Sequence, residues 1–416
     1  MENWIFHVDG NAFYAAIECQ RNPELRPYPV AVTGDPEARR GIVLTANYIA
    51  KRRGVKTGEA IWEAQQKCPG LICVGAHYDQ YIKYSDHMKK NILGEYTDLI
   101  ESFGLDEAWV SVRVKDLPEA VKLADHLRER IKFELGITAS IGVANNKPFA
   151  KLGSDYEKPD ATTVFAPESY EKVVWKIPAY DLLYVGPATT KRLLKYNILT
   201  IGDLANTEPE WIQGVLGKNG LMLRTFARGE DRAPVMRQDA VSQVKSVGNS
   251  TTTPIDVETE EDVRCVFTLL AESVSARMRE GGFRAKCISI AVRTAKDLMW
   301  YSSQRAIKFP TSSTAEIIQT AMALYKDRQY EFYRPFRSFG LQCSQLSSVF
   351  SPLQLDMFDR EGELERIEAL ENSIQGLRSR FGHHIIRLGA ATMNPQLAGI
   401  NPRDDHRAPA AAYYTG

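Results

Sequence analysis

Strand-like and helix-like segments alternate along the first third of this chain, and this alternation constrains its fold more than any other feature. Short apolar, partly β-branched runs that end at turn residues predict strands, and apolar residues spaced near 3.6 predict amphipathic helices. The predicted strands cover residues 4–8, 105–114 and 138–144, and the predicted helices cover residues 12–20, 81–99 and 121–135. Such an alternation is typical of an α/β sheet domain.

The 416 residues are too many for one ordinary core, and we expect two to four domains. A Pro-, Gly- and Arg-rich stretch over residues 21–75 interrupts the alternation and predicts an inserted subdomain. Short helices around glycines and no strand are expected over residues 178–233. A second, α+β domain follows, with helices near 260–280 and 314–326 and strands near 287–292 and 336–341. One more helix is expected over residues 363–381, and the Pro- and Ala-rich end is expected to be mobile.

Composition excludes several classes of protein. Lys and Arg number 52, as do Asp and Glu, so no global charge attracts the chain to nucleic acid or membrane. With 44% hydrophobic and 25% charged residues, the chain is neither collagenous, wholly disordered nor an integral membrane protein. The six cysteines form no CxxC pair, and the first residues, MENWIFHVDG, do not resemble a signal peptide. We expect a reduced, cytoplasmic protein without structural zinc.

Three carboxylates lie at strand ends rather than on helix faces: Asp9 and the neighbours Asp106 and Glu107. Clustered carboxylates are the ligands of hard divalent cations, and two such ions can activate an attacking oxygen and stabilise a leaving one. Consecutive strand residues face opposite ways, so both acids reach one site only if the strand ends or bends there. On spacing alone, a solvated Asp-Glu turn is the simpler interpretation.

The segment after Asp9 favours the functional interpretation. Phe13-Tyr14-Ala15-Ala16-Ile17-Glu18 places two aromatics at the start of a helix. Here the sequence resembles the Y-family of translesion DNA polymerases, in its bacterial polymerase IV or UmuC-like branch. The resemblance implies that Asp9 is a metal ligand, that Tyr14 is the steric gate beneath the incoming sugar, and that Phe13 packs beside it. A ring under the sugar would reject a 2′-hydroxyl by clash. Without the resemblance, Tyr14 is equally an ordinary core aromatic.

Further motifs follow the order and spacing of this family across almost the whole chain. Residues 45–56, TANYIAKRRGVK, are similar to its fingers motif, 104–109, GLDEAW, to its Ser-Ile-Asp-Glu-Ala-Tyr motif, and 141–159 to its palm segment that ends in Ser-Asp-x-x-Lys-Pro. These motifs imply that Asp106 and Glu107 complete the metal-binding triad. They also imply that the nucleotide pocket includes Phe13, Ile42, Thr45, Tyr48, Lys51 and Lys158.

Two later regions resemble the DNA-binding parts of the family. Residues 185–194, VGPATTKRLL, look like its helix-hairpin-helix, which implies contacts from Gly186, Lys191 and Arg192 to a DNA phosphate. The segment from Lys245 is similar to the start of its little finger, and Lys245, Ser246, Arg293 and Arg337 are implied DNA contacts. Basic residues on the strand-like runs of this domain predict a positive sheet face, with a solvated edge as the alternative.

Residues 354–358, QLDMF, resemble the Gln-Leu-x-Leu-Phe peptide with which bacterial polymerases bind the sliding clamp. Gln354, Leu355, Met357 and Phe358 are then the implied contacts to the β subunit. Apolar side chains in a polar tail suggest a pocket that receives them. An internal docking strap is the alternative.

The resemblance implies an α/β and α+β multidomain fold shaped as a right hand. Its implied parts are a ferredoxin-like palm (1–20 and 76–170), small fingers (21–75), a helix-hairpin-helix thumb (171–235), a linker (236–244), an α+β little finger (245–350) and a C-terminal tail (351–416) with the clamp peptide.

The implied activity is low-fidelity, template-directed DNA synthesis in translesion synthesis and DNA repair within the SOS response. It would use two Mg²⁺ ions, for which Mn²⁺ can substitute. The partners would be primer-template DNA, dNTP and the clamp, with no membrane, and the protein would act as a monomer. Two rivals are a catalytically inactive, clamp-bound mutagenesis scaffold and a palm-fold nucleotide cyclase. The scaffold would lack the carboxylates, and the cyclase would need neither the hairpin motif nor the clamp peptide.

Overall fold

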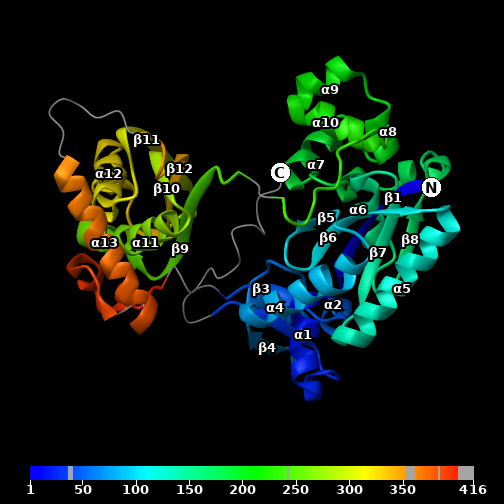
Figure 1. The fold of residues 1–416 in the computed structure, drawn as a ribbon, viewed down its shortest axis with the longest axis horizontal. Coiled ribbons are helices and arrows are strands. Elements are labelled where there is room, and N and C mark those ends of the chain that lie inside the picture. The colour runs from blue at the N-terminus through cyan, green and yellow to red at the C-terminus, as the bar shows by residue number, and fades with distance from the viewer. Residues whose placement is uncertain (36–40, 241–242, 353–360, 383–384, 402–416) are drawn as a thin grey trace. The chain divides into compact units, whose positions relative to one another are not determined.

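The protein is described by a computed structural model over residues 1–35, 41–240, 243–352, 361–382 and 385–401, without the side chains of 361–365 (Figure 1). Contacts within the chain divide it into two units. The main part of the first is Met1–Gly34 and Ile42–Ser242, and the main part of the second is Gln243–Arg407. Each unit is a separate body with its own sheet and core.

A five-stranded mixed sheet is the centre of the first unit (Figure 1). In order across the sheet its strands are β5 (Ile100–Phe103), β6 (Glu107–Val114), β1 (Glu2–Gly10), β7 (Ala139–Ala144) and β8 (Thr162–Phe165). The central strand β1 is antiparallel to both β6 and β7, whereas β7 and β8 are parallel. The predicted α/β sheet domain is therefore confirmed.

Both faces of this sheet are covered, because β1 is buried from Trp4 to Gly10. Trp4, Phe6 and Val8 pack in the core formed with α1 (Phe13–Arg21) and α5 (Leu117–Leu135). The alternate residues of β1 face α6 (Lys147–Tyr156), and Ile5 shares a core with Phe149 of that helix. Ionisable side chains of β1 that face α6 are thereby removed from water.

The long helix predicted over residues 81–99 is shorter and interrupted. It consists of α4 (Tyr78–Asp86), a π-helical turn (His87–Ile92) and a 3-10 turn (Leu93–Glu95). The chain then enters β5, a strand that the sequence analysis does not predict, because its apolar residues continue the helical spacing.

The described residues within 21–75, where the sequence predicts an insertion, include a small three-stranded sheet. Its strands, in order, are β3 (Val43–Ala46), β2 (Val30–Thr33) and β4 (Ile72–Gly75). The helices α2 (Tyr48–Arg52) and α3 (Ile61–Lys67) pack with them around a core that includes Val43, Ala50 and Ala64.

Short helices make up the last part of the first unit. They are α7 (Pro187–Lys195), α8 (Ile201–Ala205), α9 (Pro209–Leu216) and α10 (Lys218–Ala227). Residues 178–233, all of which the structure describes, contain no strand beyond an isolated bridge between Pro178 and Thr200, as predicted.

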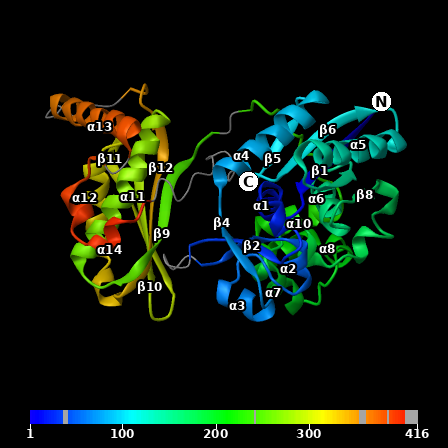
Figure 2. The same ribbon diagram turned by 90° about the horizontal axis from the view of Figure 1, so that it is seen from below.

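The second unit is a β-α-β-β-α-β arrangement whose strands are all antiparallel (Figure 2). The sheet runs in the order β11 (Trp300–Thr311), β10 (Phe283–Thr294), β12 (Phe336–Ser348) and β9 (Ser246–Val257). The helices α11 (Glu260–Glu280) and α12 (Thr314–Asp327) cover one face, and their bounds agree with the prediction to within one residue. The predicted α+β domain is confirmed.

After the second sheet, the described residues 361–382 and 385–401 pack on the second unit, and the expected mobility of the Pro- and Ala-rich end stays a prediction because residues 402–416 lie outside the described chain. Helix α13 (Glu361–Phe381) joins α11 through buried ion pairs, Arg279 with Glu371 at 2.7 Å and Glu272 with Arg378 at 2.6 Å. Residues after it form a 3-10 turn and α14 (Pro395–Ala398), and Ala391, Leu397 and Ile400 are buried in the core of the second unit. Across the described residues, no helix is both long and apolar enough to cross a membrane.

Candidate active site

The three acidic residues that lie far apart in the sequence meet at one end of the five-stranded sheet. Asp9, near the end of β1, lies opposite Glu107, the first residue of β6. The amide of Gly10 donates a hydrogen bond to the carbonyl of Asp106 at 2.9 Å. Gly104, at φ +81°, begins the turn that separates β5 from β6, so Asp106 lies in a bend rather than inside a strand. This bend removes the objection that neighbouring strand residues face opposite ways.

Two lysines from one segment hold these carboxylates. The Lys151 ammonium lies 2.8 Å from a carboxylate oxygen of Glu107 and 3.2 Å from one of Asp9. The Lys158 ammonium lies 2.7 Å from Asp9 and 2.6 Å from Asp155. A cation therefore already lies between Asp9 and Glu107, which is the position that a bound metal ion would take.

The surroundings of the Asp106 carboxyl raise its pKa. Burial, followed by the charges of Glu107 and Asp9, raises its pKa to about 6. A buried lysine opposes this effect: Lys89 donates to the carbonyl of Gly104 at 2.6 Å, and burial lowers the pKa of its own ammonium to about 8. A pocket that disfavours an isolated carboxylate favours one that is neutralised by a cation.

Burial disfavours the charged forms of Lys151 and Lys158, yet the nearby carboxylates outweigh this effect. Glu107, Asp9 and Asp155 raise the pKa of Lys151, and Asp9 and Asp155 raise that of Lys158. Both lysines are therefore cations at physiological pH. Asp155 gives each of them a further carboxylate partner, one that lies outside the triad.

Helix α6 reaches the triad because glycines allow it to lie directly on the sheet. A Cβ on Gly142 of β7 would lie 1.9 Å from the carbonyl oxygen of Ala150, so no side chain fits there. Gly153 approaches the same point from the helix. The helix begins at the N-cap Asn146, whose side chain accepts from the amide of Phe149 at 2.9 Å. This close packing brings Lys151 to within hydrogen-bonding distance of Asp9.

The sequence analysis missed one member of the site, His7. Its side chain is fully buried and lies two residues before Asp9, hence on the same face of β1. One ligand atom each from His7, Asp9 and Glu107 lie within 4.8 Å of one another, a spacing that can hold a metal ion. Burial, followed by the charge of Lys151, holds the pKa of His7 well below its usual range. The period of two from Asp9 could have identified this residue.

The ring of the proposed steric gate is held by stacking. Tyr14 stacks on Tyr81 with ring centres 4.3 Å apart and planes inclined by 11°. The Tyr81 hydroxyl donates a hydrogen bond to the buried carboxylate of Glu18 at 2.7 Å, which fixes the position of the Tyr81 ring. Phe13 is buried beside Tyr14, with ring centres 6.0 Å apart. The two aromatics at the start of α1 thus differ: Phe13 belongs to the core, and Tyr14 is half-buried.

Tyr48 is the first residue of α2 and Lys51 lies in its last turn, and the charge of Asp9 acts on both side chains. Asn47 caps this helix by accepting from the amide of Ala50 at 3.0 Å, and its own amide donates to the carbonyl of Tyr28 at 2.8 Å. The Lys51 ammonium lies 4.9 Å from the centre of the Tyr48 ring. Burial and the nearby charge of Lys158 lower the pKa of Lys51, and burial raises that of Tyr48.

The other two predicted pocket residues lie on the same small sheet. Thr45 is in β3, opposite Val32, and is half-buried. Ile42 precedes β3 and is 44% exposed, and it forms an isolated bridge with Ala60. Within the described chain, no hydrogen bond or ion pair joins either residue to the acidic triad.

The predicted hairpin contacts lie on an exposed helix start. Gly186 is the N-cap of α7, Pro187 is its first residue, and Lys191 and Arg192 are exposed. Tyr184 adopts φ +67°, the left-handed region that favours glycine.

The middle of the sheet of the second unit carries no charge on the face where the sequence predicts basic residues. Two rows of residues cross the face opposite α11 and α12, and all of them are small or uncharged: Gly248, Gln342, Ser289 and Gln304, then Ser250, Gly340, Ala291 and Ser302. Arg293 is at the end of β10, where its side chain donates to the carbonyl of Leu298 at 2.9 Å. Lys245 is exposed, and Ser246 and Arg337 are half-buried. The predicted charge thus lies outside these two rows.

Lys147 is a structural residue. Its ammonium lies 2.5 Å from the carboxylate of Glu101, and both side chains are largely buried. Its carbonyl accepts from the Trp109 indole at 3.0 Å. The predicted clamp contacts Gln354, Leu355, Met357 and Phe358 lie outside the described residues.

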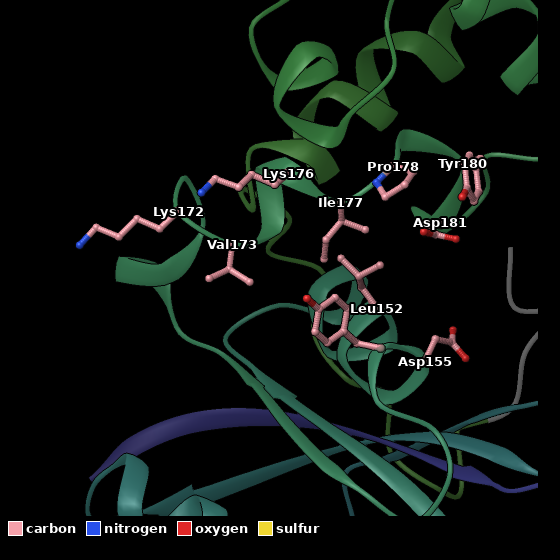
Figure 3. A pocket seen from close by; sticks show the side chains of 10 residues that line it. Leu152, Asp155, Lys172, Val173, Lys176, Ile177, Pro178, Tyr180 and Asp181 are labelled. Carbon is pink, nitrogen blue, oxygen red and sulfur yellow. The ribbon is translucent and has the colours of Figure 1, made fainter.

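A cavity of about 710 Å³ opens on the other side of Asp155, between α6 and residues 172–181 (Figure 3). Leu152 and Asp155 of α6 line one wall, and Ile177 and Asp181 lie opposite. Burial, followed by the charge of Asp155, raises the pKa of Asp181. The cavity shares Asp155 with the lysine network but does not include the triad.

The sequence matches two family models, impB/mucB/samB family over residues 8–155 and impB/mucB/samB family C-terminal domain over residues 244–357. It is 41% identical to DNA polymerase IV of Acetivibrio thermocellus over 94% of this chain and 97% of the relative. It is 34% identical to DNA polymerase IV 1 of Bacillus subtilis over 93% of this chain and 92% of the relative.

The fold is similar to that of a Y-family DNA polymerase chimera of known structure. The TM-score is 0.72 at 24% identity, and the match covers 82% of this chain and 99% of the other. The right-hand fold class is confirmed, and neither the scaffold nor the cyclase gains support. The matched models, the DNA polymerase IV relatives and the fold together show that the chain belongs to the Y-family of DNA polymerases, in its DNA polymerase IV group.

Proposed function

We propose that this DNA-directed DNA polymerase adds dNTP to a primer 3′-hydroxyl in low-fidelity translesion synthesis and DNA repair, at a centre built from Asp9, Asp106 and Glu107. One observation carries the assignment: Asp9 lies opposite Glu107, and the amide of Gly10 donates to the carbonyl of Asp106. Two Mg²⁺ ions bound there would lower the pKa of the primer hydroxyl and neutralise charge on the triphosphate. The raised pKa of Asp106 and the lysine between Asp9 and Glu107 support a cation site.

The cations around the triad are proposed to bind the triphosphate. Lys158, Lys51 and the hydroxyl of Tyr48 provide positive charge and a hydrogen bond on the side of the inserted subdomain. Lysine offers a point charge rather than the paired donors of arginine, so this pocket neutralises phosphate without fixing its orientation in a bidentate contact. Tyr14, held by Tyr81, would lie beneath the sugar, with Thr45 and Ile42 nearer the base.

We assign the palm to residues 1–20 and 76–170, the fingers to 21–75, the thumb to 171–235, the linker to 236–244, the little finger to 245–350 and the tail to 351–416. The N-terminus of α7, with Gly186, Lys191 and Arg192, is proposed to bind a DNA phosphate. The flat, uncharged rows of the second sheet would let a duplex backbone approach the strands, with Lys245, Ser246, Arg293 and Arg337 as polar contacts around them.

The remaining parts of the proposal concern partners and setting. Gln354, Leu355, Met357 and Phe358 are proposed to bind the β sliding clamp. The protein is proposed to act as a cytoplasmic monomer in the SOS response, with Mn²⁺ able to replace Mg²⁺.

Primer extension tests the activity directly. The assay uses the full chain, a labelled primer-template, all four dNTPs and Mg²⁺, with primer-free and chelator controls. The proposal requires stepwise extension that depends on template, primer and metal. DNA binding without any product would indicate a scaffold, and consumption of nucleotide without primer would indicate a cyclase.

A further inference from the structure

His7 lies beneath the acidic triad in a position that no role assigned above explains. It is completely buried in the strand β1, and its ring lies edge-on to that of Trp109, with centres 5.2 Å apart. Nδ1 lies 2.8 Å from the hydroxyl oxygen of Ser154, whereas Nε2 makes no hydrogen bond within the described chain. An unpartnered polar atom in a buried position is unusual enough to need a cause.

The hydrogen bonds around Ser154 assign the form of the imidazole. The Ser154 hydroxyl donates its single proton to the carbonyl of Lys151 at 2.8 Å. It therefore accepts from His7, so the ring proton is on Nδ1 and the lone pair is on Nε2. A ring whose Nδ1–H is bound by the protein and whose Nε2 is free has the arrangement of a metal-ligating histidine.

The free lone pair faces an acceptor rather than a donor. Nε2 lies 3.4 Å from Oε2 of Glu107, a carboxylate oxygen. Two acceptors at this distance repel each other unless a cation lies between them. Two ligand atoms bound at right angles, each about 2.1 Å from one ion, lie about 3.0 Å apart. The observed distance is close to that value, and an oxygen of Asp9 completes the group within 4.8 Å.

We propose that His7 Nε2 is a direct ligand of a divalent ion held with Asp9 and Glu107, and that it shifts the preference of this site from Mg²⁺ toward Mn²⁺. This inference rests on the proposed metal site and adds a nitrogen to it. Carboxylate-only sites suit Mg²⁺, whereas imidazole nitrogen binds transition ions more strongly.

Lys151 has an alternative partner if an ion takes its place. Its ammonium now bridges Asp9 and Glu107, and it also lies 3.3 Å from Asp155, four residues further along α6. A metal ion that binds the first two carboxylates would leave Lys151 paired with Asp155. The exchange replaces one cation with another and leaves no buried charge alone.

Pulsed electron paramagnetic resonance of bound Mn²⁺ tests this ligand without measuring activity. The sample is the full chain without a histidine tag, with Mn²⁺, dNTP and a primer-template whose primer ends in a dideoxynucleotide. Protein made with ¹⁵N-histidine is compared with unlabelled protein. We expect nitrogen coupling from a directly bound imidazole, changing from ¹⁴N to ¹⁵N on labelling.

Two variants identify the histidine. His7→Phe keeps a buried ring, and we expect it to lose the coupling and to bind Mn²⁺ about tenfold more weakly or worse, with a smaller change for Mg²⁺. His87→Gln removes an exposed histidine and should retain both the nitrogen coupling and the affinity for Mn²⁺. If His7→Phe fails to fold, His7→Gln takes its place, and persistence of the coupling in that variant likewise overturns ligation by His7.

The outcomes separate this inference from the proposed function. Bound Mn²⁺ without nitrogen coupling in the wild-type protein overturns ligation by His7 and leaves a carboxylate site. Coupling that persists in His7→Phe also overturns it. Mn²⁺ binding that Asp9→Asn does not weaken contradicts the proposed metal site itself.

Discussion

The two sheets of this protein place their polar residues in opposite environments. The five-stranded sheet is covered on both faces, and His7, Asp9 and Glu107 lie between it and α6. The helices α11 and α12 cover one face of the four-stranded sheet, and Gly248, Ser289 and Gly340 are among the small or uncharged residues of the opposite face. The five-stranded sheet buries charged side chains away from water, whereas the four-stranded sheet presents small, uncharged side chains on the face opposite α11 and α12.

This difference fits the function proposed for each sheet. Electrostatic interactions are stronger where water is excluded, so acids that must hold cations gain from burial between a sheet and a helix. DNA phosphates need many weak contacts along a path, and small side chains allow the backbone of a strand to approach them. Under the proposed function, catalytic charge is concentrated at the buried end of one sheet, and contacts to DNA are distributed over the uncharged face of the other.

The largest effect is expected at the buried end. Asp106→Ala should slow primer extension at least about 10³-fold, because a metal ligand contributes several kcal/mol to the stabilised transition state. Rapid-quench kinetics at saturating DNA measures the rate, and a gel shift should show that DNA still binds. Asp86→Ala, which removes an exposed acid paired with Lys90, is the matched control and should leave the rate unchanged. Normal synthesis by Asp106→Ala would refute the assignment of this residue.

The sequence predicts the elements whose apolar residues face a core. The helix over residues 314–326 is recovered because Ile317, Ala321 and Leu324 are buried at helical spacing, and the helix over 260–280 is recovered although it is buried on almost every side. β11 is missed because Gln304, Arg305 and Ala306 are exposed, so no apolar alternation marks it. Helix α13 is predicted too, over residues 363–381, but the ion pairs of Arg279 and Arg378 that join it to α11 are not, because their partners are distant in the sequence.

The sequence predicts which residues form the candidate site, but it does not predict how they are placed relative to one another. Family resemblance identifies Asp9, Asp106 and Glu107, yet their approach depends on strand register and on the turn at Gly104. The position of Lys151 between two carboxylates depends on close packing at Gly142, which no local pattern encodes.

The next effect concerns the stacked aromatics beside the triad. Tyr14→Ala should raise incorporation of ribonucleotides relative to deoxyribonucleotides about 100-fold, because the ring that clashes with a 2′-hydroxyl is removed. Single-nucleotide insertion with matched rNTP and dNTP gives the ratio of kcat/KM. Tyr14→Phe keeps the ring stacked on Tyr81 and should preserve discrimination. Unchanged sugar selection in Tyr14→Ala would assign the gate to another residue.

A pH dependence follows from the raised pKa of Asp106, which is about 6. Below this value the carboxyl is protonated and cannot bind a cation, so metal affinity should fall up to about tenfold per pH unit as the pH drops through 6. The effect on folding has the opposite sign. Because folding raises this pKa above its unfolded value of 3.8, the contribution of Asp106 to stability is greatest at low pH and is lost as the pH rises through 6.

Mn²⁺ titrations of the full chain at pH values from about 5 to about 7.5 test this dependence. Lys89→Met removes the cation that stabilises the Asp106 carboxylate, and the midpoint should move to higher pH. A wild-type affinity that does not change across this range would contradict the burial argument.

The smallest effect is expected on the uncharged face of the four-stranded sheet. Ser289→Glu places a carboxylate in the middle of the uncharged rows and should weaken binding of primer-template about fivefold at low salt, since one like-charge contact costs about 1 kcal/mol in water. Fluorescence anisotropy measures binding, and the rate at saturating DNA should not change. Gln319→Glu adds the same charge on the exposed side of α12 and is the control. Equal effects of the two substitutions would mean that DNA does not use the uncharged face.

The central claim is that Asp9 and Asp106, distant in the sequence, act in one metal-dependent centre. A double-mutant cycle of single-turnover primer extension tests it with Asp9→Asn, Asp106→Ala and the combined variant. Residues that act as a unit lose their function together, so the combined variant should be little slower than either single variant, each at least about 10³-fold below wild type. If the two losses multiply instead, the residues act independently, and the account of a single centre is wrong.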